Sequence, residues 1–203
     1  LALKKILEAI YEPRFLNCMY GFIPNRGCHD AIKELYKRLN NTKICYIVDA
    51  DIKGFFDHMK HEWIIKFLNL YIKDPNIIGL VKKYLKVGVL DGGELMMNEE
   101  GSAQGNIISP ILANIYMHNV LTLWYKFIIT KECKGDNFLI VYADDFVAGF
   151  QYKWEAENYY KLLKERMEKF GLQLEESKSR LLQSGAYIAR AKQKSGESTR
   201  LET

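Results

Sequence analysis

The spacing of apolar residues along the chain predicts several helices that each bury one side. After Asp30 the apolar positions recur at intervals of three and four residues, as they do in two stretches further on. A later stripe of the same kind stops at Gly171, where a helix would end. The stripes consist of Ile32, Leu35 and Leu39; of Ile64, Phe67, Leu68 and Tyr71; of Ile77, Leu80, Val81, Tyr84 and Leu85; and of Ala156, Tyr159, Leu163, Met167 and Phe170.

Other apolar runs have the pattern of strands. The run "KICYIVDADI" is apolar on both faces and rich in β-branched residues, as in a central strand. "KVGVLDGGELMMNEEG" carries Asp-Gly-Gly between short apolar runs and predicts a hairpin. Ser109 and Pro110 open a long apolar helix that reaches about Phe127. This order of elements predicts an α+β fold, with an antiparallel sheet and helices on one of its faces.

Composition is that of a globular chain with a sizeable core, in one domain or in two lobes of one. The 203 residues are 48% apolar and 27% charged, and the net charge of +4 is compatible with a polyanionic partner without indicating one. The start at Leu1, inside an expected helix, suggests a piece of a longer polypeptide. Asn114, His118 and Asn119 interrupt the most apolar helix, which favours burial against a sheet over membrane insertion. The four cysteines show no CxxC pairing, which argues against a disulfide framework or a zinc knuckle. We therefore expect a reducing cytoplasm.

Candidate chemistry centres on Asp144 and Asp145, which lie side by side within "FLIVYADDFVAGF". In a regular strand they would point to opposite faces, but at the tip of a tight hairpin they can act together. Two such charges about 4 Å apart repel by roughly 4 kcal/mol at an effective dielectric of about 20, which a hard divalent cation would offset. A third carboxylate is expected nearby. The strand-end candidates are Asp49, Asp51 and Asp57.

An Asp-Asp dipeptide alone would more often be a surface turn, but several blocks accompany it here. "YADD", "DADIKGFFD" and "GSAQGNIISPILANIY" resemble three sequence blocks of reverse transcriptases, and "YGFIPNRGCHDAI" and "FGLQLEESKSRLL" are similar to an upstream and a downstream block. They run in family order across nearly the whole chain, and the similarity is to bacterial group II intron reverse transcriptases, or maturases. The resemblance implies fingers at 1–40 and 59–103, palm at 41–58 and 104–187, and a basic tail at 188–203 that leads to further palm and thumb.

The resemblance also implies a metal site. Asp51, Asp144 and Asp145, with the main-chain carbonyl of Ile52, would bind two Mg²⁺ ions that activate a primer 3′-hydroxyl and stabilise charge on the triphosphate. Asp49 shares a strand face with Asp51, but the family pattern favours Asp51.

On the nucleotide side, Phe56 falls where related enzymes place an aromatic gate that excludes a ribose 2′-hydroxyl. RNA-dependent RNA polymerases tend to have an aspartate there, and a slip of one residue would place Asp57 in that position. Core packing is the alternative role for Phe56. The resemblance places Gln104 and Gly105 over the nucleotide, and Pro110 at the start of a helix that supports the templating pair. It also places Lys178 at the leaving pyrophosphate and Arg26 on the RNA side.

We therefore expect an RNA-directed DNA polymerase of a group II intron-encoded protein, which extends a DNA or RNA primer with dNTPs on an RNA template such as the intron, in the bacterial cytoplasm. The isolated fragment should be weakly active or inactive, and a homodimer is considered as a further assembly. The alternatives are a maturase module that only holds intron RNA, and a retron, diversity-generating or CRISPR-associated reverse transcriptase. Pro110 favours the intron type over the diversity-generating one.

Overall fold

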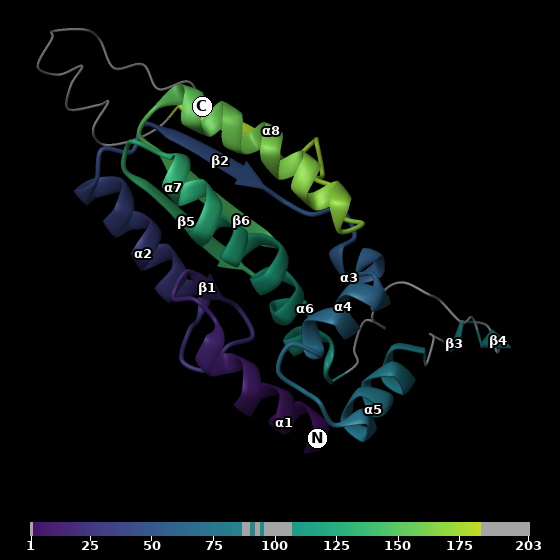
Figure 1. The fold of residues 1–203 in the computed structure, drawn as a ribbon. Helices are drawn as coiled ribbons and strands as arrows, with labels where there is room; N and C mark the ends of the chain where they lie inside the picture. Colours follow the sequence, from purple (N-terminus) through teal and green to yellow (C-terminus); the bar gives the residue numbers. More distant parts are fainter. Residues whose placement is uncertain (1, 87–89, 92–93, 96–106, 184–203) are drawn as a thin grey trace, which may run out of the picture.

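A computed structural model describes residues 2–86, 90–91, 94–95 and 107–183 (Figure 1). The helices are α1 (Ala2–Tyr11), α2 (Cys28–Asn41), α3 (Phe55–His58), α4 (His61–Leu68), α5 (Pro75–Lys86), α6 (Ser109–Met117), α7 (Thr130–Glu132) and α8 (Lys153–Lys169), with a 3₁₀ turn η1 (Glu12–Arg14) and π-helical segments η2 (His118–Thr122) and η3 (Tyr125–Ile129). The strands are β1 (Met19–Tyr20), β2 (Tyr46–Ala50), β3 (Leu90–Asp91), β4 (Glu94–Leu95), β5 (Asn137–Tyr142), β6 (Asp145–Phe150) and β7 (Arg180–Gln183).

The main sheet has five strands in the order β1-β5-β6-β2-β7. Four of them, β5, β6, β2 and β7, pair antiparallel as predicted, and β2 is flanked by neighbours on both sides. The fifth, β1, is a two-residue strand that pairs parallel to β5 at the edge of the sheet (Figure 1). The predicted hairpin forms as β3 and β4. The predicted α+β fold is thus confirmed, with a parallel edge that the sequence pattern did not indicate.

Helices cover both faces of this sheet, so the expectation of helices on one face is wrong. One face packs into the main core with α6 and α8, through residues such as Val48, Leu139 and Phe146. The opposite face, which includes Ile47 and Phe138, packs against α2 (Figure 1). The physical reason is that β2 and β5 are apolar on both sides, and each side needs a layer that excludes water.

The predicted helices form, but in α5 and α2 the side that faces the core differs from the predicted side. In α5 the buried residues are Ile78, Val81 and Leu85, whereas Leu80 is 47% exposed. In α2 the residue Ile32 is 55% exposed. Where apolar residues are adjacent in a helix, the sequence leaves the direction of its buried side uncertain by about one residue. Contacts with distant elements then decide which of them faces the core.

The long apolar helix runs from Ser109 through η2 and η3 to the end of α7, slightly beyond the predicted end. The π-helical segments were not predicted. Arg166 of α8 donates to the carbonyl oxygens of Val120 (2.9 Å) and Asn119 (3.3 Å) in η2, which stabilises main-chain groups at this irregular turn. Among the described residues, no helix is both long enough and apolar enough to cross a bilayer.

Candidate active site

The Asp-Asp pair lies at the tip of a tight hairpin, as the sequence predicted. β5 and β6 pair antiparallel up to Tyr142 and Asp145, which leaves Ala143 and Asp144 as the turn. Ala143 has a left-handed backbone with φ of +57°. Asp144 therefore projects from the turn and Asp145 from the first position of β6, so that the two carboxylates escape the up-down alternation of a regular strand.

Asp51 reaches the same end of the sheet from the neighbouring strand. β2 pairs with β6, and Ala50 lies opposite Phe146, so Asp51 follows β2 at the end where Asp145 begins β6. The three aspartates line one cleft of about 320 Å³. Its remaining lining residues are Ile52, Lys53, Gly54, Phe55, Phe56, Asp57, Glu175 and Lys178.

Negative charge accumulates in this cleft. The pKa of Asp145 is raised above its ordinary value by loss of water contact and then by the charges of Asp144 and Asp51, although much of the residue stays exposed. Lys178 opposes this effect. The Nζ atom of Lys178 donates to Oδ2 of Asp51 at 2.8 Å, and this hydrogen bond raises the pKa of Lys178. The two lysines that line the cleft, Lys53 and Lys178, thus only partly compensate its five acidic residues.

The segment around Lys178 also holds the main chain of Asp51. The Glu175 N–H donates to the Asp51 carbonyl at 2.8 Å, and the Asp51 N–H donates to Oγ of Ser179 at 3.4 Å. Ser177 hydrogen-bonds the Glu175 carboxylate and lowers its pKa. Sequence reasoning missed Glu175, a fifth acidic residue at the cleft beside Asp51, Asp57, Asp144 and Asp145. Its position three residues before Lys178, in "LEESKS", was the available signal.

Phe56 lies at the same cleft, on α3. Gly54 begins this short helix with φ of +53°, and the ring of Phe56 contacts the buried Phe55 with ring centroids 5.5 Å apart. Phe56 is half-buried and Asp57 is exposed. Because both residues line the cleft, the assignment of Phe56 as the gate stays a prediction.

The rival candidate Asp49 is engaged elsewhere. It lies opposite Arg180 in the β2–β7 pairing, and its Oδ2 is 3.7 Å from Nε of Arg180. Asp49 does not line the cleft, whereas Asp51 does. The geometry favours Asp51 over Asp49 as the partner of the hairpin aspartates.

The other candidates lie away from the described cleft or outside the described residues. Pro110 stands in the first turn of α6, as predicted for a helix start, but does not line the cleft. Arg26 donates to the carbonyl oxygens of Leu16 (2.9 Å) and Met19 (3.3 Å), so its guanidinium holds the chain before β1. Gln104 and Gly105 lie outside the described residues.

The donor chemistry of the cleft fits a hard divalent cation, since carboxylate and carbonyl oxygens are the ligands that such ions prefer. In the described part of the chain, no group of three or more His, Cys, Asp or Glu side chains is arranged closely enough to hold an ion in this conformation. The side chain of Asp51 is instead paired with Lys178. The residues are thus assembled in one cleft, with one of them held by an ammonium group.

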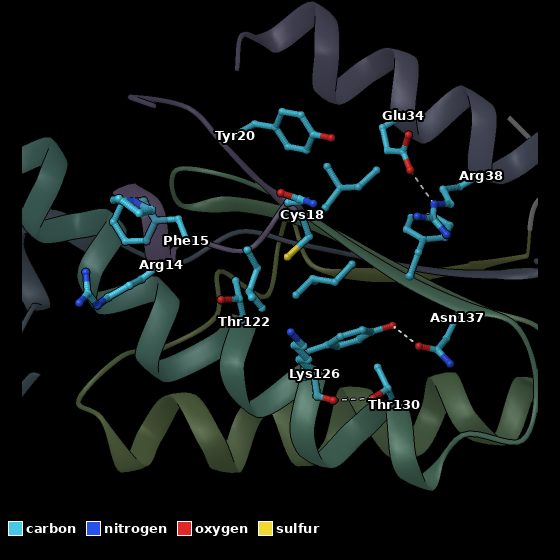
Figure 2. A pocket seen from close by; sticks show the side chains of 17 residues that line it. Arg14, Phe15, Cys18, Tyr20, Glu34, Arg38, Thr122, Lys126, Thr130 and Asn137 are labelled. Carbon is cyan, nitrogen blue, oxygen red and sulfur yellow. Dashed lines mark hydrogen bonds and ion pairs between the residues drawn. The ribbon is translucent and has the colours of Figure 1, made fainter. Parts of the chain in front are cut away.

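A larger hollow of about 710 Å³ lies apart from the aspartates, between α2, the β1–β5 edge and η3. Figure 2 shows Glu34 and Arg38 on its α2 side and Asn137 on the β5 side. These groups already have partners: Arg38 donates to Glu34 at 2.7 Å and Tyr125 donates to Asn137 at 3.1 Å. This hollow is larger than the aspartate cleft, but its lining lacks the convergent carboxylates that make the smaller cleft the better candidate site.

Comparison with curated proteins finds relatives encoded in introns. The "Group II intron-encoded protein LtrA" of Lactococcus lactis subsp. cremoris is 39% identical over 135 residues, which are 66% of this chain and 22% of that protein. The "Uncharacterized 91 kDa protein in cob intron" of Schizosaccharomyces pombe is 41% identical over 119 residues, 58% of this chain and 14% of that protein. The chain thus spans about a fifth or less of these relatives.

Solved structures show the same fold at low sequence identity. Apo telomerase from Candida tropicalis superposes with a TM-score of 0.63 and 15% identity, over 90% of this chain and 35% of that chain. Telomerase from Candida albicans, in complex with a fragment of telomeric RNA, gives 0.62 and 15%, over 90% and 33%.

A comparison with protein families matches residues 2–195 to the reverse transcriptase (RNA-dependent DNA polymerase) family. The predicted resemblance to group II intron reverse transcriptases is confirmed by this match together with the intron-encoded relatives. Since the match covers nearly the whole sequence, the chain belongs to the reverse transcriptase family.

Proposed function

We propose that this chain is the catalytic core of an RNA-directed DNA polymerase from a group II intron-encoded protein. The observation that carries the proposal is the convergence of Asp51, Asp144 and Asp145 at one cleft, from two strands that are neighbours in the sheet. Core packing does not explain three carboxylates at one sheet end, because burial and then the charges of Asp144 and Asp51 raise the pKa of Asp145.

The reaction we assign is nucleotidyl transfer. The 3′-hydroxyl oxygen of a primer forms a bond to the α-phosphorus of a dNTP, the bond from that phosphorus to the pyrophosphate oxygen breaks, and the hydroxyl proton passes to water. Bound by Asp51, Asp144, Asp145 and the main-chain carbonyl of Ile52, two Mg²⁺ ions would supply activation of the hydroxyl and neutralisation of the triphosphate. The family implies a divalent metal in general; the identity and number of the ions are part of the proposal.

Residues beside the aspartates would handle the nucleotide. Lys178, which already lines the cleft, would release Asp51 and neutralise the leaving pyrophosphate. Phe56 would lie beneath the sugar and exclude a 2′-hydroxyl. Gln104 and Gly105 would cover the nucleotide, and Pro110 would begin the helix that supports the templating pair. The role of Arg26 on the RNA side stays a prediction.

The partners we propose are an RNA template, with the intron RNA as the first candidate, a DNA or RNA primer, and dNTPs. The names of intron-encoded relatives support an intron-linked role. We also propose the division into fingers (1–40 and 59–103) and palm (41–58 and 104–187), since β2, β5, β6 and β7 all fall within the palm ranges. The four free cysteines are consistent with a reducing bacterial cytoplasm.

The test is primer extension on an RNA template, with this chain expressed within the full open reading frame that encodes it. We compare dNTPs with ribonucleotides, and wild type with Asp145→Asn. The expected result is extension with dNTPs that the substitution reduces by at least about 1,000-fold, because one of the proposed metal ligands loses its charge.

Asp49→Asn is the matched control, because it removes a carboxylate from β2, two residues before Asp51, without changing the lining of the cleft. Its extension rate should stay within a few-fold of wild type. A wild-type protein that does not extend primers, but binds structured intron RNA in a salt-sensitive manner that survives Asp145→Asn, would refute the proposal in favour of an RNA-holding module.

A further inference from the structure

The hairpin tip that carries the aspartate pair has a strained backbone. Ala143 adopts φ of +57° although it has a Cβ atom, and it is only 6% exposed. Residues other than glycine rarely adopt this conformation, and it persists only where surrounding structure enforces it. The position of Asp144 and Asp145 therefore depends on what packs behind this turn.

Gly21 lies directly behind the turn. It follows β1, which pairs with Val141 and Tyr142, and the Val141 N–H donates to the carbonyl of Cys18 at 2.8 Å. A Cβ atom on Gly21 would lie 3.0 Å from the main-chain nitrogen of Ala143 and 3.4 Å from the carbonyl carbon of Tyr142. The backbone of Gly21, with φ of +71°, thus packs against the backbone of the turn, where no other side chain fits without displacement.

Asn114 holds Gly21 through a hydrogen bond to its carbonyl. It lies in α6 and is only 1% exposed, and its Nδ2 donates to the carbonyl oxygen of Gly21 at 3.1 Å. Asparagine is a poor residue for a helix interior, and a buried amide costs free energy unless it is hydrogen-bonded. The hydrogen bond to Gly21 accounts for an amide at this position and joins the core helix to the segment that backs the hairpin tip.

We propose that Asn114 and Gly21 are positioning residues for the aspartate pair. Asn114 holds the carbonyl of Gly21, the backbone of Gly21 supports the Ala143 turn, and this chain of contacts keeps Asp144 and Asp145 in place relative to Asp51. The inference rests on the proposed polymerase function for its catalytic consequence, but the positioning itself can be measured without it.

The test combines two variants with two matched controls in the full open reading frame. Asn114→Leu removes the donor at similar size, and Asn119→Leu is its control, because the Asn119 amide donates to the Ile115 carbonyl within the same long helix at 2.8 Å. Gly21→Ala adds the methyl group that meets the turn. Gly79→Ala is its control, because a Cβ there meets nothing within 4 Å. The second pair keeps the test valid if Asn114→Leu does not fold.

The first readout is amide hydrogen exchange of the metal-free protein. We expect exchange to accelerate in residues 141–146 in both test variants, with the rest of the sheet and both controls unchanged. The second readout is primer extension, in which kcat should fall by about 10- to 100-fold through misplaced carboxylates while KM for the template–primer stays within about twofold.

Test variants that behave like their controls in both readouts would overturn the inference, as would acceleration spread over the whole sheet, which indicates a merely structural role. If wild type fails to extend primers, the proposed function fails, and local exchange at residues 141–146 still decides whether Asn114 and Gly21 position the turn.

Discussion

Acidification should destabilise the fold through one buried histidine. His118 lies in η2 and is 3% exposed, its Nδ1 is 3.2 Å from Oγ1 of Thr122, and the ring of Phe15 packs edge-on against it. Burial, followed by the positive charge of Lys126, lowers the pKa of His118 from 6.5 to about 4. The folded state therefore keeps this imidazole neutral where the unfolded chain already binds a proton.

The direction and size of the effect follow from linkage. Because the unfolded state binds more protons between these two pKa values, the free energy of unfolding falls as pH drops through 6.5, and the loss is complete below pH 4. At about 1.36 kcal/mol per pKa unit, His118 should contribute a loss of about 2 kcal/mol between pH 7.5 and pH 5, and about 3 kcal/mol in all.

The assay is urea unfolding followed by tryptophan fluorescence at pH 7.5 and pH 5. His118→Asn removes the titrating group and keeps an amide that can face Thr122, so its loss on acidification should be about 2 kcal/mol smaller than that of wild type. His29→Asn, at an exposed position of α2, is the matched control and should follow wild type. Equal pH dependence of His118→Asn and wild type would refute the reasoning.

Four further substitutions test packing and selectivity. Gly149→Ala puts a methyl group 2.2 Å from Cε1 of Phe138 and should lower the stability measured by thermal melting by about 1–3 kcal/mol, whereas Gly79→Ala in α5, which meets nothing within 4 Å, should raise it by about 0.5–1 kcal/mol. Arg166→Met leaves two η2 carbonyls without their donor and should lower the free energy of unfolding in urea by about 1–3 kcal/mol; an unchanged value would contradict the role of the guanidinium. Phe56→Ala should raise ribonucleotide incorporation relative to dNTPs in single-nucleotide extension, and an unchanged ratio would argue against the gate.

The features that could be predicted from sequence are those that a short stretch encodes by itself. Two apolar runs on either side of "ADD" define the hairpin, and its tip follows from the change of pattern. The placement of Asp51 beside the hairpin is not encoded in a short stretch, because it depends on the pairing of β2 with β6. The resemblance to a known family grouped Asp51 with Asp144 and Asp145 but gave no strand pairing, and the pairing of β2 with β6 that brings them to one sheet end is a finding of the structure.

The features that were missed depend on contacts between distant segments. A two-residue strand such as β1 has too little sequence pattern to be recognised, and its parallel partner follows it by more than a hundred residues. The same holds for α2 on the second face of the sheet and for the close approach of Gly21 to Ala143. The side of α5 that faces the core was ambiguous for a related reason, since its apolar residues occupy more than one face.

The two halves of the aspartate cleft are supported separately. Glu175 and Ser179 hold the main chain of Asp51, whereas Gly21 and the strand pairing of β1 hold the hairpin tip with Asp144 and Asp145. Among the described strands of the sheet, the register between β2 and β6 joins these supports. A change in one support can therefore displace one set of carboxylates without unfolding the protein. We therefore expect a mutation in either support to alter the distance between Asp51 and the hairpin pair, on which the proposed nucleotidyl transfer depends.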